Sequence, residues 1–316
     1  MPTSNATAVV FEQPGQIAVR PVALLAPTDA DCTVAVHYSG ISTGTERLLW
    51  SGRMPAFPGL AYPLVPGYES VGEVIAAGAE SPLQPGQRVF VPGSSGFADV
   101  RGLFGGTASH VVVPAARLVA LDDNFGEDGI LLALAATAYH AVTRSADGRL
   151  PQLIIGHGVL GRLIARTVLA LGGDAPTVWE TQAARRSAAV PYPVVDPAAD
   201  SRSDYAVICD VSGAADLLDT LVGRLARGGE IVLAGFYEQP LNLTFPPAFM
   251  REARLSIAAE WQPADLEQVL ALIAAKRLSL AGLITHRQGV GEADAAYATA
   301  FGDADCLKMM LDWSLN

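Results

Sequence analysis

The sequence predicts an α/β protein in which a doubly wound parallel sheet is joined to a second, β-rich domain. Three observations lead to this fold class. The first 140 residues carry short apolar runs separated by turns, whereas strands and helices alternate from residue 151 onward. An apolar run at 153–155 passes directly into a glycine-rich turn and a helical stretch. The chain has 316 residues, half of them hydrophobic, which is enough for two domains with a sizeable core.

The front part of the chain is a series of predicted short strands. Turns rich in Pro and Gly, such as 80–82 and 84–86, separate apolar or alternating runs, a pattern typical of strands. A helical run at 129–142 closes this part, so we place the first domain at 1–142. The predicted strands are 8–11, 33–38, 70–75, 88–91 and 108–113.

Residues 143–276 are predicted to form the domain with the parallel sheet. Strand-like and helix-like segments alternate there, which favours βαβ units. An amphipathic helix is expected at 264–276, and the Pro- and Asp-rich segment 191–203 is expected to be a surface loop. The predicted strands of the sheet are 153–155, 177–179, 206–209 and 230–234.

The turn after the first of these strands has the pattern G-x-G-x-x-G. Gly156 permits a tight turn, Gly158 lets the backbone approach a pyrophosphate, and Gly161 lets the helix pack closely on the strand. The helix starts at Val159 and Leu160, where free N–H groups and the positive end of the dipole favour phosphate. We therefore predict a Rossmann-type dinucleotide site, the alternative being a tight turn without a ligand.

The choice of cofactor depends on the acidic residue that ends the next strand. Glu180 lies about 20 residues beyond the turn, where a carboxylate accepts both ribose hydroxyls of NAD and repels the 2′-phosphate of NADP. Arg185 and Arg186 follow and offer positive charge for a phosphate. They lie a helical turn or more beyond Glu180, so we interpret them as a solvated helix face and predict NAD.

Three further residues lie near the predicted cofactor. Ser212 and Phe236 each follow a predicted strand, and the carboxyl ends of parallel strands line the ligand crevice. His157, inside the glycine turn, is interpreted as a solvent-facing spacer, the alternative being contact with phosphate or with a proton path.

Composition narrows the class of partner and the compartment. The net charge of −11 argues against nucleic acid as a partner. No apolar run reaches the roughly 18 residues expected of a membrane span, so we predict no integral membrane segment. The three cysteines, Cys32, Cys209 and Cys306, form no C-x-x-C pair, which argues against a zinc module and fits a reducing cytoplasm.

Several short motifs resemble those of the medium-chain dehydrogenase/reductase superfamily, in the same order and across nearly the whole chain. This resemblance implies that the first domain is a GroES-like catalytic domain and that 277–316 returns to it. The motifs, besides the glycine turn, are Gly-Ile-Ser-Thr-Gly-Thr-Glu at 40–46, Pro-Gly-Tyr-Glu at 66–69, Gly-Gln-Arg-Val at 86–89, Thr-Ala-Tyr at 137–139 and Leu-Ile-Thr-His-Arg at 283–287.

More narrowly, the chain resembles the zinc-free family of bacteriochlorophyllide a dehydrogenases within that superfamily. The stretches that carry this resemblance are 39–46, 52–60, 101–106 and 245–254. The resemblance implies oxidation of the 3-(1-hydroxyethyl) group of a (bacterio)chlorophyllide to acetyl, with NAD as the acceptor, and it leaves room for a homodimer. Two alternatives stay open. One is a zinc-free NADPH-dependent quinone or enone reductase, and the other is a non-catalytic pigment-binding protein.

The resemblance also implies that no metal is bound. At the positions of the zinc ligands stand Thr43, Tyr68 and a residue near Ala133, and these do not supply the three ligands that catalytic zinc requires. Donors for a different metal site are present in the sequence, although unpaired histidines on β-rich sequence are usually structural. These donors are His37, Glu46, Glu69, His110 and His140.

Without zinc, the hydroxyl proton of an alcohol must reach a base or a relay while hydride leaves the carbinol carbon. Thr45 matches the residue that relays this proton in zinc-dependent members, and Tyr68 would contact the substrate oxygen. Glu69 would orient the substrate or carry charge. The alternatives are packing for Tyr68 and a structural carboxylate for Glu69. Apolar side chains at 48–50 and 54–60, with Phe97 and Phe104, are candidates for the chlorin cleft or for ordinary core.

Overall fold

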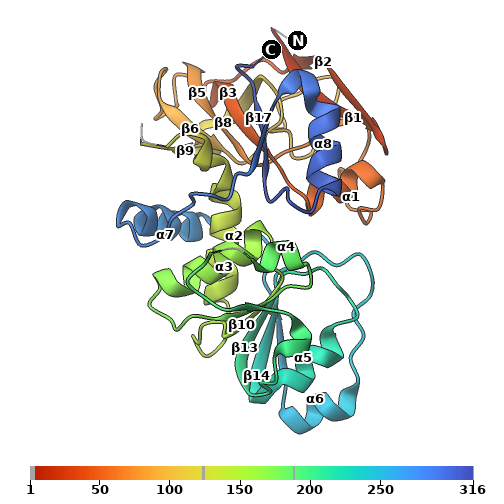
Figure 1. The fold of residues 1–316 in the computed structure, drawn as a ribbon. Helices are drawn as coiled ribbons and strands as arrows, with labels where there is room; N and C mark the ends of the chain where they lie inside the picture. The colour runs from red at the N-terminus through yellow and green to blue at the C-terminus, as the bar shows by residue number, and fades with distance from the viewer. Residues whose placement is uncertain (1–3, 123–124, 188, 316) are drawn as a thin grey trace. The chain divides into compact units, whose positions relative to one another are not determined.

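The computed structural model describes residues 4–122, 125–187 and 189–315, and the chain divides into two compact units (Figure 1). The first unit comprises Met1–Ala133 and Ala281–Asn316, and the second comprises Leu134–Leu280. The end of the chain therefore belongs to the same unit as its beginning.

The first unit contains two β-sheets around one apolar core. Its smaller sheet has the order β2 (Gln16–Leu24), β1 (Ser4–Gln13), β4 (Leu64–Val65) and β7 (Arg101–Gly102). Its larger sheet has the order β16 (His286–Gly289), β17 (Met309–Asp312), β3 (Asp31–Ile41), β5 (Ser70–Ala77), β6 (Arg88–Val91) and β9 (Val119–Ala120), with β8 (His110–Pro114) paired to β3.

The helices of the first unit are short, and they pack beside the strands. Helix α8 lies against β2, β16 and β17, on the side where Figure 1 also draws α1. Strand β17 runs antiparallel to β3, with Met309 opposite Ile41, and this register brings the end of the chain to the end of β3. The helices are α1 (Thr45–Ser51), α8 (Ala293–Gly302) and the 3-10 turns η1 (Ala115–Arg117), η2 (Glu127–Leu131) and η4 (Val290–Glu292).

The second unit is built on a six-stranded parallel sheet. The chain passes from β10 to β11 and β12 on one side, and then from β13 to β14 and β15 on the other. A doubly wound sheet of this kind has its switch point between β10 and β13, where ligands bind at the carboxyl ends of the strands. The strands are β12 (Val194–Val195), β11 (Thr177–Trp179), β10 (Leu153–Ile155), β13 (Tyr205–Asp210), β14 (Leu225–Leu233) and β15 (Arg254–Ile257).

Helices accompany these strands, as the alternating sequence pattern predicts. The strand residues Leu153, Ile208 and Ile231 are fully buried, as expected for a parallel sheet that is covered on both faces. The helices are α2 (Leu132–Thr143), α3 (Val159–Ala170), α4 (Ala183–Arg186), α5 (Leu218–Arg224), α6 (Phe245–Arg251) and α7 (Pro263–Ala274), with the 3-10 turn η3 (Pro197–Ala199).

The predicted fold class is confirmed, the helical run at 129–142 is found as predicted, and one local prediction is wrong. Segment 191–203 is not all loop, because it contains β12 and η3; a strand of two residues is too short to show an alternating pattern. The helical run at 129–142 begins as the 3-10 turn η2 and becomes α-helical at Leu132. Gly129 packs so closely that a Cβ there would lie 2.6 Å from Cγ2 of Val71.

Candidate active site and cofactor site

The glycine turn has the close approaches that its sequence predicts. Gly156 has φ +102°, a left-handed conformation that favours glycine. A Cβ on Gly161 would lie 1.9 Å from the carbonyl oxygen of Gly156, so only glycine lets α3 pack against the turn. Helix α3 begins at Val159, and its N-cap residue Gly158 provides no side-chain cap. The N–H groups of Val159, Leu160 and Gly161 therefore belong to the first helical turn, whose amides lack intrahelical partners.

Glu180 follows β11 and is held by the backbone on both oxygens. Its Oε2 accepts the N–H of His157 at 3.1 Å, and its Oε1 accepts the N–H of Gln182 at 2.8 Å. The carboxyl group is buried, at 7% exposure. Each carboxylate oxygen still has a lone pair, because an ionised carboxylate offers about four acceptor sites. The carboxylate is thus preoriented next to the glycine turn.

The interpretation of Arg185 and Arg186 as a solvated helix face is wrong. Arg186 donates to the carbonyl oxygens of Glu180 and Thr181 at 2.9 and 2.6 Å, and it forms an ion pair with Asp196 at 3.1 Å. Both arginines are half-buried. Arg186 therefore braces the end of β11, a function that its spacing from Glu180 does not reveal.

The two secondary cofactor candidates lie at neighbouring strand ends. A Cβ on Gly156 would lie 3.6 Å from Cα of Ser212, so the residues that follow β10 and β13 are adjacent. A Cβ on Gly213 would lie 3.0 Å from the carbonyl oxygen of Phe236, which follows β14 and is about half exposed. The structure thus brings together the ends of three parallel strands, as the sheet topology requires.

His157 corrects a prediction. It is not a solvent-facing spacer, because its side chain is fully buried. Its Nδ1 lies 2.8 Å from the carbonyl oxygen of Arg185, and its Nε2 lies 3.1 Å from the hydroxyl of Tyr192. Local sequence patterns do not reveal these contacts, since the partners lie 28 and 35 positions further along the chain.

In the first unit, three hydroxyl groups meet where β3 ends. The hydroxyl of Tyr68 lies 2.7 Å from Oγ of Ser42 and 3.4 Å from Oγ1 of Thr45, the first residue of α1. The ring of Tyr68 packs edge-on against Phe104, with ring centres 5.2 Å apart. Burial raises the pKa of Tyr68 above its usual value, so the phenol stays protonated at ordinary pH. We call Ser42, Thr45 and Tyr68 the hydroxyl cluster.

Glu69 points to a different partner. Its Oε2 lies 2.6 Å from Nζ of Lys308, and the same ammonium group donates to the carbonyl oxygen of Ile41 at 3.1 Å. Both side chains are at most 2% exposed. A Cβ on Gly40 would lie 2.4 Å from Glu69 Oε2, so this glycine makes room for the carboxylate. Glu69 Oε1 has no hydrogen-bond partner within the described part of the chain.

A second buried carboxylate, Glu46, lies beside the hydroxyl cluster. Its Oε1 accepts the N–H of Ser42 at 3.0 Å, and its Oε2 accepts the hydroxyl of Tyr297 at 2.6 Å. Glu46 is fully buried, and burial raises its pKa to about 7. Sequence reasoning named neither Ser42 nor Glu46 as a catalytic candidate, although both lie in the 40–46 motif. Lys308 and Tyr297 were missed because they lie more than 200 positions from their partners.

The residues at the zinc-ligand positions do not fit zinc. Thr43 is exposed, Tyr68 belongs to the hydroxyl cluster, and Ala133 contributes only a buried methyl group. Zinc requires nitrogen, sulfur or carboxylate donors in a tetrahedral arrangement. Across 4–122, 125–187 and 189–315, no group of three or more His, Cys, Asp or Glu side chains converges as a metal site would require.

The donors for a different metal site have other partners. His140 Nδ1 lies 2.9 Å from a carboxylate oxygen of Asp265, and His110 Nδ1 lies 3.1 Å from Oγ of Ser109. Glu46 and Glu69 are engaged with Tyr297 and Lys308, as described above. Within the described ranges, these donors do not gather into one metal-binding group.

The apolar candidates for the chlorin cleft divide into two groups. Leu48, Leu49 and Phe97 are buried in the core of the first unit, so the packing interpretation holds for them. Phe57 is 37% exposed, and Phe104 is half-buried against Tyr68. Phe104 is therefore the aromatic candidate that lies in contact with the hydroxyl cluster.

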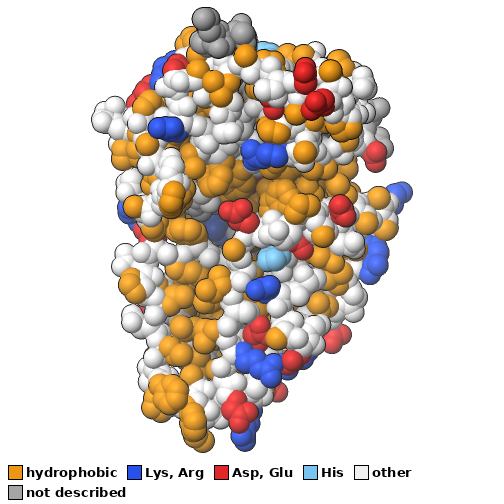
Figure 2. Space-filling view, turned by 180° about the vertical axis from the view of Figure 1, so that it is seen from behind, with side chains coloured by type: hydrophobic (Ala, Val, Ile, Leu, Met, Phe, Trp, Pro, Cys, Tyr) orange, Lys and Arg blue, Asp and Glu red, His pale blue; other side chains and the backbone are white. Residues whose placement is uncertain are grey.

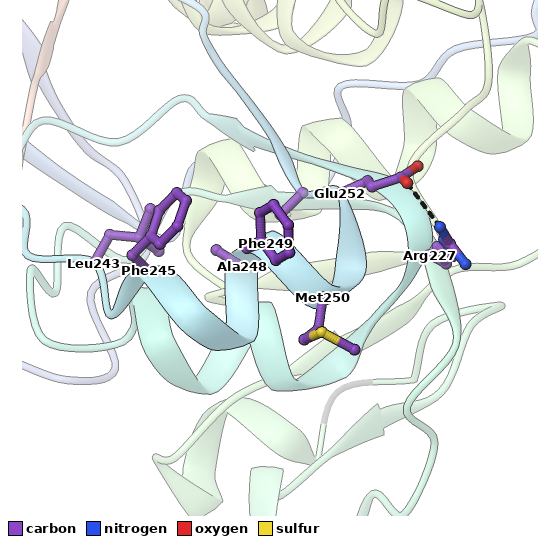
Figure 3. A pocket seen from close by; sticks show the side chains of 8 residues that line it. Arg227, Leu243, Phe245, Ala248, Phe249, Met250 and Glu252 are labelled. Atoms are coloured by element: carbon purple, nitrogen blue, oxygen red, sulfur yellow. Dashed lines mark hydrogen bonds and ion pairs between the residues drawn. The ribbon is translucent and has the colours of Figure 1, made fainter.

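An apolar pocket of about 500 Å³ lies along α6 in the second unit (Figure 3). Phe245, Phe249 and Met250 are 64–72% exposed there, and an ion pair joins Arg227 to Glu252 beside them. Figure 2 shows hydrophobic side chains gathered at the end of the unit where Figure 1 draws α6. The lining includes none of the predicted cofactor residues. In the described ranges, no helix has the length and apolar character needed to span a bilayer.

Comparison with known proteins gives a consistent picture. The family model of the alcohol dehydrogenase GroES-like domain matches residues 28–123. The chain is 56% identical over 306 residues to the 2-desacetyl-2-hydroxyethyl bacteriochlorophyllide A dehydrogenase of Rhodobacter capsulatus, and the match covers 96% of this chain and 97% of that relative.

Two solved structures share the fold at lower identity. A short chain alcohol dehydrogenase from E. coli CFT073, in complex with NADH, matches with a TM-score of 0.82 at 19% identity, covering 98% of this chain and 100% of that one. A protein from Sinorhizobium meliloti 1021, provisionally assigned as a zinc-binding dehydrogenase and bound to NADP, matches with a TM-score of 0.81 at 22% identity over 98% and 100%.

Proposed function

The chain belongs to the family of the 2-desacetyl-2-hydroxyethyl bacteriochlorophyllide A dehydrogenases, and we propose on that basis how its residues perform the family's oxidation. The enzyme removes two hydrogens from the hydroxyethyl side chain of a bacteriochlorophyllide, in bacteriochlorophyll biosynthesis. The carbinol carbon loses a hydride and the hydroxyl loses a proton, which leaves an acetyl group. The observation that carries this function is the 56% identity along nearly the full length of both proteins.

The hydride acceptor is a nicotinamide dinucleotide, whose C4 takes up the hydride when it is bound. Within this class we propose NAD. Glu180 supports the choice, because its carboxylate is fixed beside the glycine turn by two backbone N–H groups. A fixed carboxylate at the end of the second strand accepts ribose hydroxyls and repels a 2′-phosphate. The amides of Val159, Leu160 and Gly161 would receive the pyrophosphate.

For the proton we propose the hydroxyl cluster as the relay. The phenol of Tyr68 is protonated, so it can accept a hydrogen bond from the carbinol while it donates its own proton onward. Ser42 lies 2.7 Å away and Thr45 lies 3.4 Å away, within reach for that transfer. Thr45 is only half-buried, so the proton leaves the relay from its hydroxyl to solvent water. A relay of this kind lets the alcohol become alkoxide-like as hydride leaves. We propose Tyr68 and Thr45 as catalytic residues and add Ser42 to the relay.

We propose that Glu69 acts as a positioning residue. Its ion pair with Lys308 ties the start of β5 to β17, and Lys308 in turn holds the carbonyl of Ile41 at the end of β3. These contacts fix the chain at Ile41, which precedes Ser42, and at Glu69, which follows Tyr68. Glu69 would thus orient the hydroxyl cluster without touching the substrate.

A turnover assay tests the function directly. Purified protein is incubated with 3-(1-hydroxyethyl) bacteriochlorophyllide a and NAD⁺, and the pigment absorbance and NADH fluorescence are followed together. We expect one NADH per acetyl product. Reduction of quinones or enones by NADPH, without oxidation of the hydroxyethyl pigment, would instead support a reductase. Tight pigment binding with no turnover under either nucleotide would support a carrier.

We also propose that the enzyme acts as a homodimer in the cytoplasm. Strand β15 is the edge of its sheet, and Leu255 and Ile257 on it are 41% and 68% exposed beside the α6 pocket. An open edge with a neighbouring apolar face is what a second copy, related by a twofold axis, would cover. Sedimentation of the wild type and of Ile257→Asp tests the dimer, which the variant should weaken.

The proposed location in the cytoplasm has separate support. All three cysteines are free and buried, which fits a reducing compartment.

A further inference from the structure

His157 joins two segments of the second unit that are separate in the sequence. Its backbone belongs to the glycine turn, whereas its ring lies between the carbonyl of Arg185 and the hydroxyl of Tyr192. The rings of His157 and Tyr192 also meet edge-on, with centres 5.7 Å apart. The side chain therefore fastens the segment after β11 onto the turn that follows β10.

The hydrogen-bond partners of the His157 ring determine which of its two nitrogens carries the hydrogen. A carbonyl oxygen only accepts, so Nδ1 must carry the hydrogen that is shared with Arg185. A neutral ring then has Nε2 as an acceptor, and the Tyr192 hydroxyl donates to it. Burial lowers the pKa of His157, which agrees with a neutral ring that is held by two hydrogen bonds. A glycine turn that served only to bring backbone close to phosphate would not require such a ring.

The contacts of Glu180 connect the His157 ring to the orientation of the cofactor-binding carboxylate. The two N–H groups that hold the carboxylate come from His157 in the turn and from Gln182 after β11. These are the two segments that the His157 ring fastens together. If the segments moved apart, the carboxylate would lose one of its two supports and its orientation.

We propose that His157 is a positioning residue for cofactor selectivity. By fastening 185–192 to the glycine turn, its ring holds Glu180 in the orientation that accepts the ribose hydroxyls of NAD and excludes the 2′-phosphate of NADP. This inference rests on the proposed function, in that it assumes a nicotinamide dinucleotide in the turn. His157 would then influence the preference between the two cofactors through Glu180, without touching the ribose itself.

Direct binding of the reduced cofactors tests the proposal without any turnover. Dissociation constants for NADH and NADPH are measured by nicotinamide fluorescence for the wild type, His157→Asn and Tyr192→Phe. Asn keeps a donor for the carbonyl of Arg185, but its amide is too short to reach the Tyr192 hydroxyl from the Nε2 position, whereas Phe removes only the hydroxyl. Because each change leaves a buried polar group unpaired, we expect NADH to bind about tenfold more weakly in His157→Asn and about threefold more weakly in Tyr192→Phe. NADPH affinity should stay within about twofold.

A control variant separates positioning from general loss of stability. Val207→Ala removes buried volume from β13, and it should lower the melting temperature while leaving the NADH to NADPH preference unchanged. When NAD⁺ is varied at saturating pigment, His157→Asn and Tyr192→Phe should show a raised KM for NAD⁺ with a much smaller change in kcat. If His157→Asn does not fold, Tyr192→Phe decides alone, because it keeps the ring and its packing.

Two outcomes would overturn the inference. In the first, the preference stays at the wild-type value although the variants melt earlier, which makes His157 a packing residue only. In the second, the affinities for NADH and NADPH fall equally, which would mean that His157 does not influence the preference between them. Failure of the proposed function looks different, since the wild type itself would then prefer NADPH or bind neither nucleotide.

Discussion

Buried carboxylates are stabilised in different ways in the two units. In the second unit, Glu180 is held by two backbone N–H groups, one of them within the glycine turn. In the first unit, Glu69 relies on the ammonium of Lys308, and Glu46 relies on one N–H and the hydroxyl of Tyr297. The carboxylate beside the nucleotide turn is thus held by backbone groups, whereas the buried carboxylates near the hydroxyl cluster depend on side chains from distant parts of the chain. The two regions should respond differently to substitution.

The largest effect should come from the hydroxyl cluster itself. Tyr68→Phe and Thr45→Val should each lower kcat by about 10²–10⁴-fold, because each removes a link of the proton relay. Affinity for NADH should stay near the wild-type value, since the turn in the second unit is untouched. Single-turnover hydride transfer isolates the chemical step from product release. Tyr62→Phe is the matched control, because that hydroxyl donates to the carbonyl of Leu49 in the same unit. Near-native transfer rates in both cluster variants would remove them from the mechanism.

The buried ion pair between Glu69 and Lys308 should have the next largest effect, which is on the free energy of unfolding. Lys308→Met leaves Glu69 as an uncompensated buried charge, which should cost about 3–5 kcal/mol in the free energy of unfolding. The double variant with Glu69→Gln should recover part of that loss. Arg227→Met breaks an ion pair that is exposed and screened by solvent, so it should leave the free energy of unfolding nearly unchanged. Urea unfolding measures all three, and an equal cost for the buried and the exposed pair would contradict the comparison.

Glu46 should make stability depend on pH. Its folded pKa of about 7 lies above the ordinary value of 4.5, so the folded state binds this proton more tightly than the unfolded state. The stability from this group is present below about pH 4.5 and is lost as the pH rises through about 7, a loss of about 3 kcal/mol. In Glu46→Gln this decline should disappear, whereas Glu12→Gln on the surface should follow the wild type. Unfolding free energies between pH 4.5 and 8 decide, and identical slopes in all three proteins would argue against a raised pKa.

A smaller effect is expected at the turn. Glu180→Ala removes both the ribose contact and the repulsion of a 2′-phosphate, so the NADH to NADPH preference should fall by about tenfold or more. Glu252→Ala, which removes an exposed carboxylate of the same unit, should leave it unchanged. Calorimetric titration of both nucleotides provides the measurement. A wild type that prefers NADPH would reverse our choice of cofactor.

Removal of metal should have no effect at all. Since Thr43, Tyr68 and Ala133 do not provide zinc ligands, dialysis against a strong chelator should leave kcat unchanged, and elemental analysis should find no stoichiometric zinc. Because the pigment ring carries magnesium of its own, the metal content is measured in protein without bound substrate. Activity that is lost on chelation and restored by zinc would show that the relay is not the whole mechanism.

The sequence alone determined the features that depend on neighbouring residues. The glycine turn, its strand and its helix follow from the spacing of Gly156, Gly158 and Gly161, because a close approach of backbone to backbone excludes a Cβ locally. The parallel sheet follows from the alternation of strands and helices. The meeting of Thr45 and Tyr68 was also expected, although only from the resemblance to a known family.

Only the tertiary structure decided which side chains share a buried site. Lys308 reaches Glu69 because β17 pairs with β3, and Tyr297 reaches Glu46 from α8. His157 reads as a spacer in the sequence, but the burial of its ring depends on Tyr192, 35 positions away. The physical reason is common to all three cases. A buried polar group must find a partner, and that partner is fixed by the packing of distant segments, which local spacing does not encode.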